Sequence, residues 1–93
     1  MKVIYVSFDE DVITELIISD LETSLPIPES ILEIGERLAI CAGLSEQIED
    51  EDEFEEALVD EYGFDAVDDD DLLKVICDYY GLDINEYIIE VLF

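Results

Sequence analysis

Apolar positions divide the N-terminal part of the chain into two short segments. Residues 2–8 are rich in β-branched and aromatic side chains, and the run is too short for a stable helix, so it predicts a strand. Acids at residues 9–11 turn the chain. Residues 12–19 fit either a helix or a second strand, and their β-branched content favours a strand antiparallel to the first.

Three later stretches show the spacing of amphipathic helices. The first follows Pro28, which suits a first helical turn, and Gly43 is expected to end it. The second begins near Asp50, which has capping-box spacing to Glu53, and runs to residue 62. The third covers residues 69–80. Their expected buried positions are Ile31, Ile34, Leu38 and Cys41, then Phe54, Leu58 and Tyr62, then Leu72, Val75, Ile76 and Tyr79.

The segments 60–65 and 78–83 share a pattern of an aromatic residue, a glycine and an apolar residue, which is typical of helix C-caps with a left-handed Gly63 or Gly81. Residues 84–93 fit a helix, which we favour, and alternate nearly as well as a strand. The sequence therefore predicts a single acidic α+β domain over residues 1–93. A short N-terminal antiparallel β-hairpin would pack with three or four amphipathic helices.

Charge changes this picture of a small packed domain. The chain has 28 acids against Lys2, Arg37 and Lys74, a formal charge of -25, yet 51% of its residues are hydrophobic. The acids must therefore cover a packed core, and they exclude ordinary binding to nucleic acid or an anionic membrane. The natural partner is a strongly basic protein surface.

Targeting and cysteine signals are sparse. No signal peptide and no apolar run of transmembrane length is visible. Cys41 and Cys77 lie far apart on apolar helix faces, which indicates buried free thiols in a cytoplasmic protein.

Residues 46–71 concentrate the charge, with 15 acids and no basic residue. Acids at residues 68–71 complement the dipole at a helix start, whereas the outer acids of the 50–62 helix have no such explanation. The acids that we expect to bind a partner are Glu49, Asp50, Asp52, Glu53, Glu56, Asp60, Asp65, Asp68, Asp69, Asp70 and Asp71.

Most chemistries fit this composition badly. The chain has no histidine, and neither cysteine has a visible activating base, so we expect no enzyme and no catalytic residues. The acids do not follow the EF-hand loop, because the sixth position counted from Asp68 is Leu73 rather than glycine, so no dedicated metal site is expected. No serine follows an aspartate as in acyl carrier proteins. We expect no cofactor.

The charge is comparable to that of a short DNA duplex. Double-stranded DNA carries one charge per about 1.7 Å of axis, so 25 charges correspond to roughly 40 Å, about a dozen base pairs. Acids three or four apart on a helix lie about 5–6 Å from each other, near the spacing of phosphates along one strand. A protein groove that gains affinity for DNA by releasing counterions would gain affinity for this acidic surface by the same route. The simplest alternative is a merely soluble acidic surface, as in salt-adapted proteins.

Residues 15–38 resemble the central part of the ArdA-type antirestriction proteins. Ile18, Asp20 and Glu22 match an "I-x-D-x-E" element, and Ile34, Glu36 and Leu38 approximate an "I-x-E-L" core; the similarity extends over about residues 12–80. The resemblance implies an elongated α+β protein that imitates bent DNA and blocks type I restriction-modification enzymes, commonly as a dimer. The present chain is much shorter than members of that family.

These patterns together predict a DNA-mimic inhibitor that occupies the DNA site of a bacterial defence nuclease, either a restriction-modification enzyme or a CRISPR effector. It would come from a phage or mobile element and act in the cytoplasm of the bacterial host, with a homodimer possible. The alternative is an acidic adaptor or immunity-type module that binds a basic protein face without imitating DNA.

Overall fold

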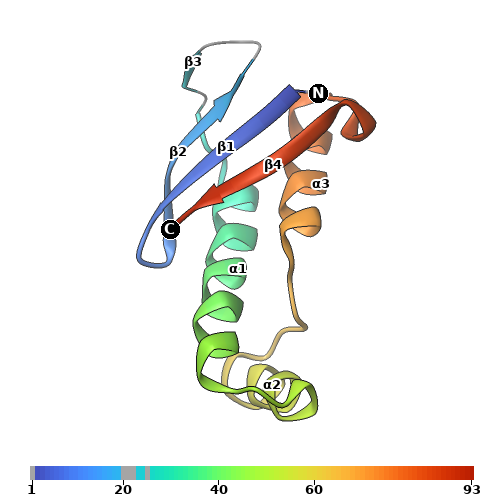
Figure 1. Ribbon diagram of the computed structural model, residues 1–93. Coiled ribbons are helices and arrows are strands. Elements are labelled where there is room, and N and C mark those ends of the chain that lie inside the picture. Colours follow the sequence, from blue (N-terminus) through green and yellow to red (C-terminus); the bar gives the residue numbers. More distant parts are fainter. Residues whose placement is uncertain (1, 20–22, 25) are drawn as a thin grey trace.

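The computed structural model of the chain describes residues 2–19, 23–24 and 26–93 (Figure 1). In chain order the elements are the strands β1 (Lys2–Asp9), β2 (Val12–Ile18) and β3 (Thr23–Ser24), the helices α1 (Glu29–Gln47) and α2 (Glu51–Ala57), a π-helical turn (Leu58–Tyr62), the helix α3 (Asp69–Tyr80), a 3-10 turn (Ile84–Glu86) and the strand β4 (Tyr87–Leu92). Asp20 and Glu22, which carry part of the family resemblance, lie outside the described residues.

The strands form one mixed sheet in the order β3-β2-β1-β4. β1 and β2 form the antiparallel hairpin that the sequence predicts, with Asp9 opposite Val12 across a two-residue turn. β4 lies on the other side of β1 and runs parallel to it. The fold is therefore α+β, as expected, but its sheet is larger than a hairpin.

A β-bulge explains why residues 12–19 looked ambiguous. Ser7 pairs with Glu15 and Phe8 pairs with Ile13, so Thr14 is an extra residue in β2. The bulge lets Ile13 and Leu16, three positions apart, both point into the core, followed by Ile18 at the usual spacing of two. A step of three is also typical of a helix, which is why the pattern fitted both elements.

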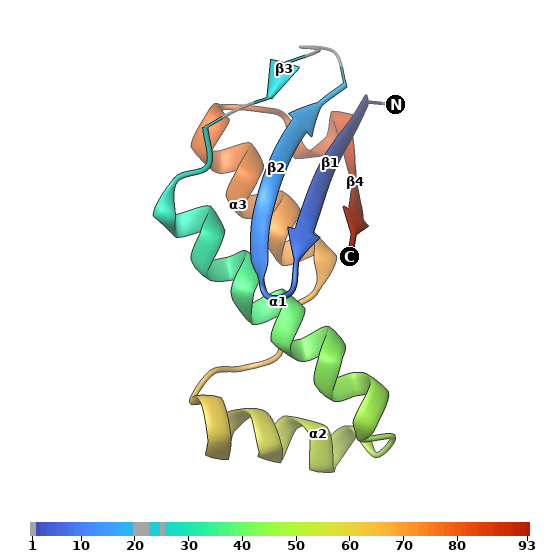
Figure 2. The same ribbon diagram turned by 90° about the vertical axis from the view of Figure 1, so that its left-hand side faces the viewer.

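Both long helices, α1 and α3, cover one face of the sheet (Figure 2). α1 packs against β2 and α3, and α3 also packs against β4. The buried side chains between these layers form one cluster, made of Ile4, Val6, Phe8, Ile13, Leu16, Ile18, Ile31, Leu38, Ala39, Leu72, Leu73, Ile76, Cys77 and Tyr87.

The C-terminal segment corrects our preference for a helix at residues 84–93. Asp83 caps a single 3-10 turn by accepting from the Asn85 backbone N–H at 3.0 Å, and the chain then enters β4. Tyr87, Ile89 and Val91 face the core at the strand spacing of two. Pairing with β1 decides between two patterns that local sequence left nearly equal.

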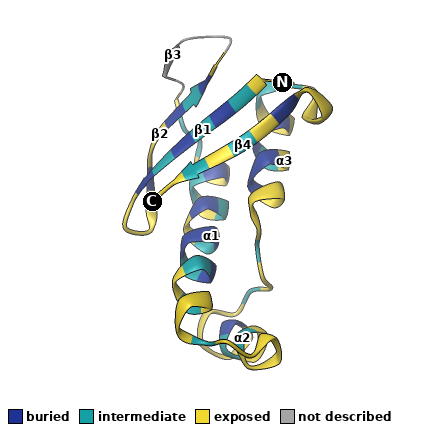
Figure 3. Ribbon diagram, in the orientation of Figure 1, coloured by how far each residue is buried: buried dark blue, intermediate teal, exposed yellow. Residues whose placement is uncertain are grey.

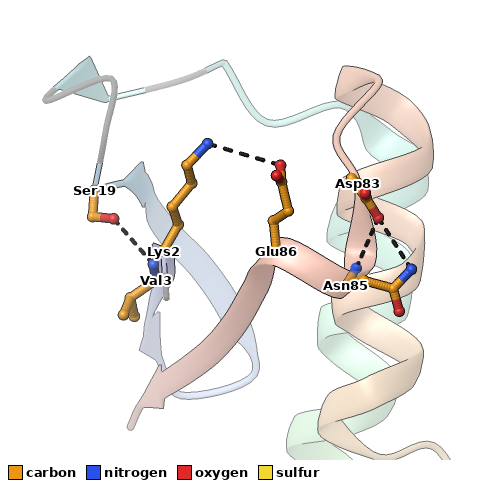
Figure 4. A network of polar contacts seen from close by, with 6 residues as sticks. All are labelled: Lys2, Val3, Ser19, Asp83, Asn85 and Glu86. Carbon is orange, nitrogen blue, oxygen red and sulfur yellow. Dashed lines mark hydrogen bonds and ion pairs between the residues drawn. The ribbon is translucent and has the colours of Figure 1, made fainter.

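Polar contacts fasten the end of the sheet where β1 and β4 begin (Figure 4). Lys2 at the start of β1 forms an ion pair with Glu86 at 3.9 Å, and the Val3 backbone N–H donates to the Ser19 hydroxyl at 3.0 Å. Asn85 donates to Asp83 from both its backbone and its side chain. The starts of β1 and β4 are thus held beside the end of β2.

The first helix differs from the prediction at two glycines. Gly43 does not end it, because α1 continues to Gln47 and Ile48 closes it with a bond from its N–H to the Leu44 carbonyl oxygen. Gly35, which the sequence pattern left unassigned, is buried where α1 crosses β2. A Cβ atom on Gly35 would lie 2.3 Å from Cδ1 of Ile13. Gly35 therefore permits the close helix-strand contact.

The second helix also differs, because it is not α-helical up to residue 62. After Ala57 it widens into the π-helical turn, and Gly63 ends it with φ 73°. Leu58 is fully buried as predicted, but Tyr62 is 47% exposed because the wider turn changes which side chains face inward. The third helix matches the predicted residues 69–80, and Gly81 caps it with φ 70°. The expected burial of Tyr79 was wrong, because that side chain is 57% exposed while Leu73 and Cys77 face the core.

The molecule is longer than a compact chain of its size. Its principal extents are 40 × 25 × 20 Å and its radius of gyration is 13.8 Å, against about 12 Å expected for 93 residues. Figure 1 shows the reason, since α1 runs beyond the sheet and α2 lies across its far end. Among the described residues, no helix combines the length and apolarity needed to cross a bilayer.

Candidate functional site

The acidic region, which we define as residues 48–68, forms the end of the molecule away from the sheet. It contains α2, the π-helical turn and the linker to α3, and Figures 1 and 2 both place α2 across the far end of α1. Eleven of its 21 residues are acids and none is basic. The region therefore concentrates charge on a part of the chain that contributes little to the sheet.

α2 begins at a carboxylate cap. The Asp50 side chain accepts from the backbone N–H groups of Asp52 at 2.9 Å and Glu53 at 3.3 Å, while acids in the first turn complement the helix dipole. Asp52, Glu53 and Glu56 share this α-helix, so pairs among them keep helical spacing. Glu49 precedes the helix and Asp60 lies in the π-helical turn, so the longer rows that the sequence suggested do not continue at α-helical spacing.

Two apolar side chains in the π-helical turn are exposed, which the sequence analysis did not predict. Val59 is 54% exposed and Tyr62 is 47% exposed, and both lie among acids. Val59 lines a shallow depression with Glu55, Asp65 and Ala66. A sequence pattern read at 3.6 residues per turn gives no sign of a change to π-helical bonding, so nothing in the sequence marked Val59 as exposed.

The acids at residues 68–71 build the start of α3. Asp68 accepts from the Asp71 backbone N–H at 3.0 Å, and Asp71 accepts from the Asp68 backbone N–H at 3.1 Å, which completes a reciprocal capping box. Asp69 and Asp70 complete the first turn. The capping box therefore gives Asp68 and Asp71 a sufficient structural role. For Asp69 and Asp70 the structural role is limited to a favourable interaction with the dipole of α3.

All eleven predicted binding acids are exposed, and the ribbon in Figure 3 is coloured as exposed over much of α2 and at the start of α3. None of the eleven forms an ion pair within the described part of the chain. Arg37 is a basic residue that lies against the acidic region; it pairs with Glu33 at 2.8 Å and its guanidinium carbon lies 5.4 Å from the Phe64 ring centroid. The acids thus present charge that the chain itself leaves uncompensated.

The cysteines are buried and free, as predicted. Burial raises the pKa of the Cys77 thiol above its ordinary 9.0, and the nearby carboxylates of Asp78 and Asp83 raise it further. Cys77 is therefore a protonated thiol at neutral pH. The described residues contain no group of three or more His, Cys, Asp or Glu side chains placed to hold a metal ion.

Comparison with known proteins gave no relative: no protein-family model, no curated protein and no solved structure matches the chain.

Proposed function

We propose that this protein is a DNA-mimic inhibitor that occupies the DNA-binding site of a bacterial defence nuclease, a restriction-modification enzyme or a CRISPR effector. Its carboxylates would stand in place of phosphates, and inhibition would be stoichiometric and competitive. The observation that carries the proposal is the set of exposed acids without ion pairs along the acidic region and the start of α3.

The dimensions of the molecule support this proposal. A long axis of 40 Å corresponds to about a dozen base pairs at 3.4 Å per pair. The Lys and Arg side chains of a DNA-binding groove would release the cations held around these carboxylates, as they release those held around DNA phosphates, so binding would gain free energy by the same route. The resemblance to ArdA-type antirestriction proteins points to the same class of target and to a possible homodimer in the host cytoplasm.

One observation favours the alternative, an acidic adaptor or immunity-type module that binds a basic face without imitating DNA. DNA presents mainly phosphates on its outer surface, whereas Val59 and Tyr62 expose apolar surface among the acids. An ordinary protein interface combines such apolar anchors with a charged rim. An adaptor would use these two side chains as anchors.

A pull-down from a bacterial lysate separates the two functions. The immobilised protein should retain a DNA-binding nuclease at low salt, and duplex DNA of a dozen or more base pairs should displace it. Each carboxylate contact that replaces a phosphate should steepen the salt dependence, as it does for DNA. Retention of no DNA-binding protein would reject the mimic. A partner that holds this protein and duplex DNA together would establish the adaptor.

A further inference from the structure

β4 is an edge strand with an open outer side. It ends the order β3-β2-β1-β4, and no described residue pairs with its far edge. Figure 1 shows α3 behind the sheet and no element beside that edge. The outward backbone N–H and C=O groups of an edge strand can pair with another extended chain. Natural edges are usually blunted by charge, proline or a covering element, and β4 contains only Glu90 as a charge.

The outward face of β4 carries two apolar side chains with Glu90 between them. Ile88 and Leu92 are each 47% exposed and lie on the face of β4 opposite the core, because Tyr87, Ile89 and Val91 face inward. An added strand would place alternate side chains beside Ile88 and Leu92. Side chains that lie opposite each other on neighbouring strands stabilise a sheet through such contacts.

An open groove of about 640 Å³ lies below the same edge, between β4 and α3. Apolar side chains, among them Leu73, Ile84 and Ile89, line it together with the carboxylates of Asp69 and Asp70. Long basic side chains suit such a groove, since their aliphatic stems can lie on apolar residues while their charges reach carboxylates.

From this edge and groove we infer a docking site for an extended basic segment of a partner protein, which adds to the sheet beside β4. The segment alternates Lys or Arg, directed toward Asp69 and Asp70, with Val or Ile, directed toward Ile88 and Leu92. Backbone pairing supplies affinity and the alternation supplies specificity, as in other strand-addition complexes. The inference does not rest on DNA mimicry, and either can hold without the other.

Charge decides between this occupant and a second copy of the chain. Antiparallel pairing of two β4 strands would bring the two Glu90 side chains close together, and like charges opposite each other destabilise a sheet. It would also join two chains that each carry a formal charge of -25. A basic segment reduces both costs.

To test the site, the isotopically labelled full chain is titrated at 0.15 M salt with a heptapeptide of alternating lysine and valine whose ends are blocked. Binding is monitored by the NMR shifts and the hydrogen exchange of the backbone amides. The largest shifts and new protection should fall on β4 amides. A peptide of the same sequence, N-methylated along both edges, should bind at least about tenfold more weakly because neither of its edges can pair with a strand. Equal binding of both peptides, or shifts confined to the acidic region, would overturn the site.

Matched variants separate the groove from general attraction. D69N/D70N should weaken peptide binding at least about fivefold more than E51Q/E55Q, which removes the same charge from α2, because salt screens charges beyond about 8 Å. Equal losses would overturn the role of the groove. Sedimentation of the free protein completes the test. A dimer with protected β4 amides would show that a second copy occupies the β4 edge, and it would reject the proposal.

Discussion

The sheet region (residues 2–19, 26–47 and 69–93) and the acidic region contrast in how each holds its charge. The sheet region has 15 acids in 65 residues, contains all three basic residues and supplies every member of the fourteen-residue buried cluster. The acidic region has 11 acids in 21 residues, no basic residue and one buried hydrophobic side chain, Leu58. The densest like charge therefore sits where the least packing depends on it.

This separation explains how so acidic a chain can fold. Repulsion between like charges weakens with distance and screening, so placing the densest group of acids at one end of a 40 Å molecule limits their cost to the core. Within the acidic region, Leu58 and the Asp50 cap hold α2 in place. Among the described residues of the acidic region, Val67 is the one that packs against the main buried cluster. The two regions should then differ in stability.

The largest expected contrast comes from two buried leucines. Leu72→Ala in the main cluster should lower the global free energy of unfolding by about 2–5 kcal/mol through lost burial and a cavity. Leu58→Ala removes the same atoms from the acidic region, so it should speed amide exchange in α2 while β1 and β4 keep their protection. Hydrogen exchange with denaturant unfolding checks both. Loss of sheet protection in Leu58→Ala would mean that the regions fold as one.

Two glycines of α1 give a smaller contrast of opposite sign. Gly35→Ala should cost about 1–3 kcal/mol, because the new methyl group meets Ile13 in the close contact with β2. Gly43→Ala has open space around it and lies within the helix, so it should stabilise by about 0.5–1 kcal/mol. Thermal unfolding measures both. A neutral Gly35→Ala would show that α1 does not approach β2 as closely as described.

The smallest effect is confined to alkaline pH and to the sheet region. The Tyr80 hydroxyl donates to the Pro26 carbonyl oxygen, and burial, then the neighbouring Tyr79, raises the Tyr80 pKa above its ordinary 10.0. Since the folded state holds this proton more tightly, its contribution is fully present below about pH 10 and is lost as pH rises through the raised pKa. Tyr80→Phe should flatten part of that fall in unfolding free energy. Equal slopes for both proteins would contradict the assignment.

Much of the sheet region could be predicted from the sequence, since local patterns and global packing agree there. The hairpin, residues 69–80 of α3 and the left-handed glycine caps followed from spacing and turn chemistry. Residues 84–93 could not be assigned, because pairing with β1, 85 residues away along the chain, selects the strand. The role of Gly35 could not be predicted either, because it depends on the short distance between α1 and β2.

The acidic region was predicted less completely. Its charge and the buried position of Leu58 were visible in the sequence, and all eleven acids of the region are exposed. The π-helical turn was not foreseeable, because it changes the period on which the prediction of Tyr62 as a buried residue depended. A run of four aspartates also gave no sign that Asp68 and Asp71 form a reciprocal capping box.

The central claim is that the outer acids of α2 and the adjacent turn serve mainly a partner, although Asp52 and Glu53 in the first turn also complement the helix dipole. Its most direct test replaces Asp52, Glu53, Glu56 and Asp60 by their amides and measures how much DNA-binding partner the folded variant retains from lysate. Thermal unfolding should be unchanged or higher, because repulsion falls, while retention should drop at least about tenfold. Undiminished retention by the folded variant, or loss of its fold, would contradict the claim.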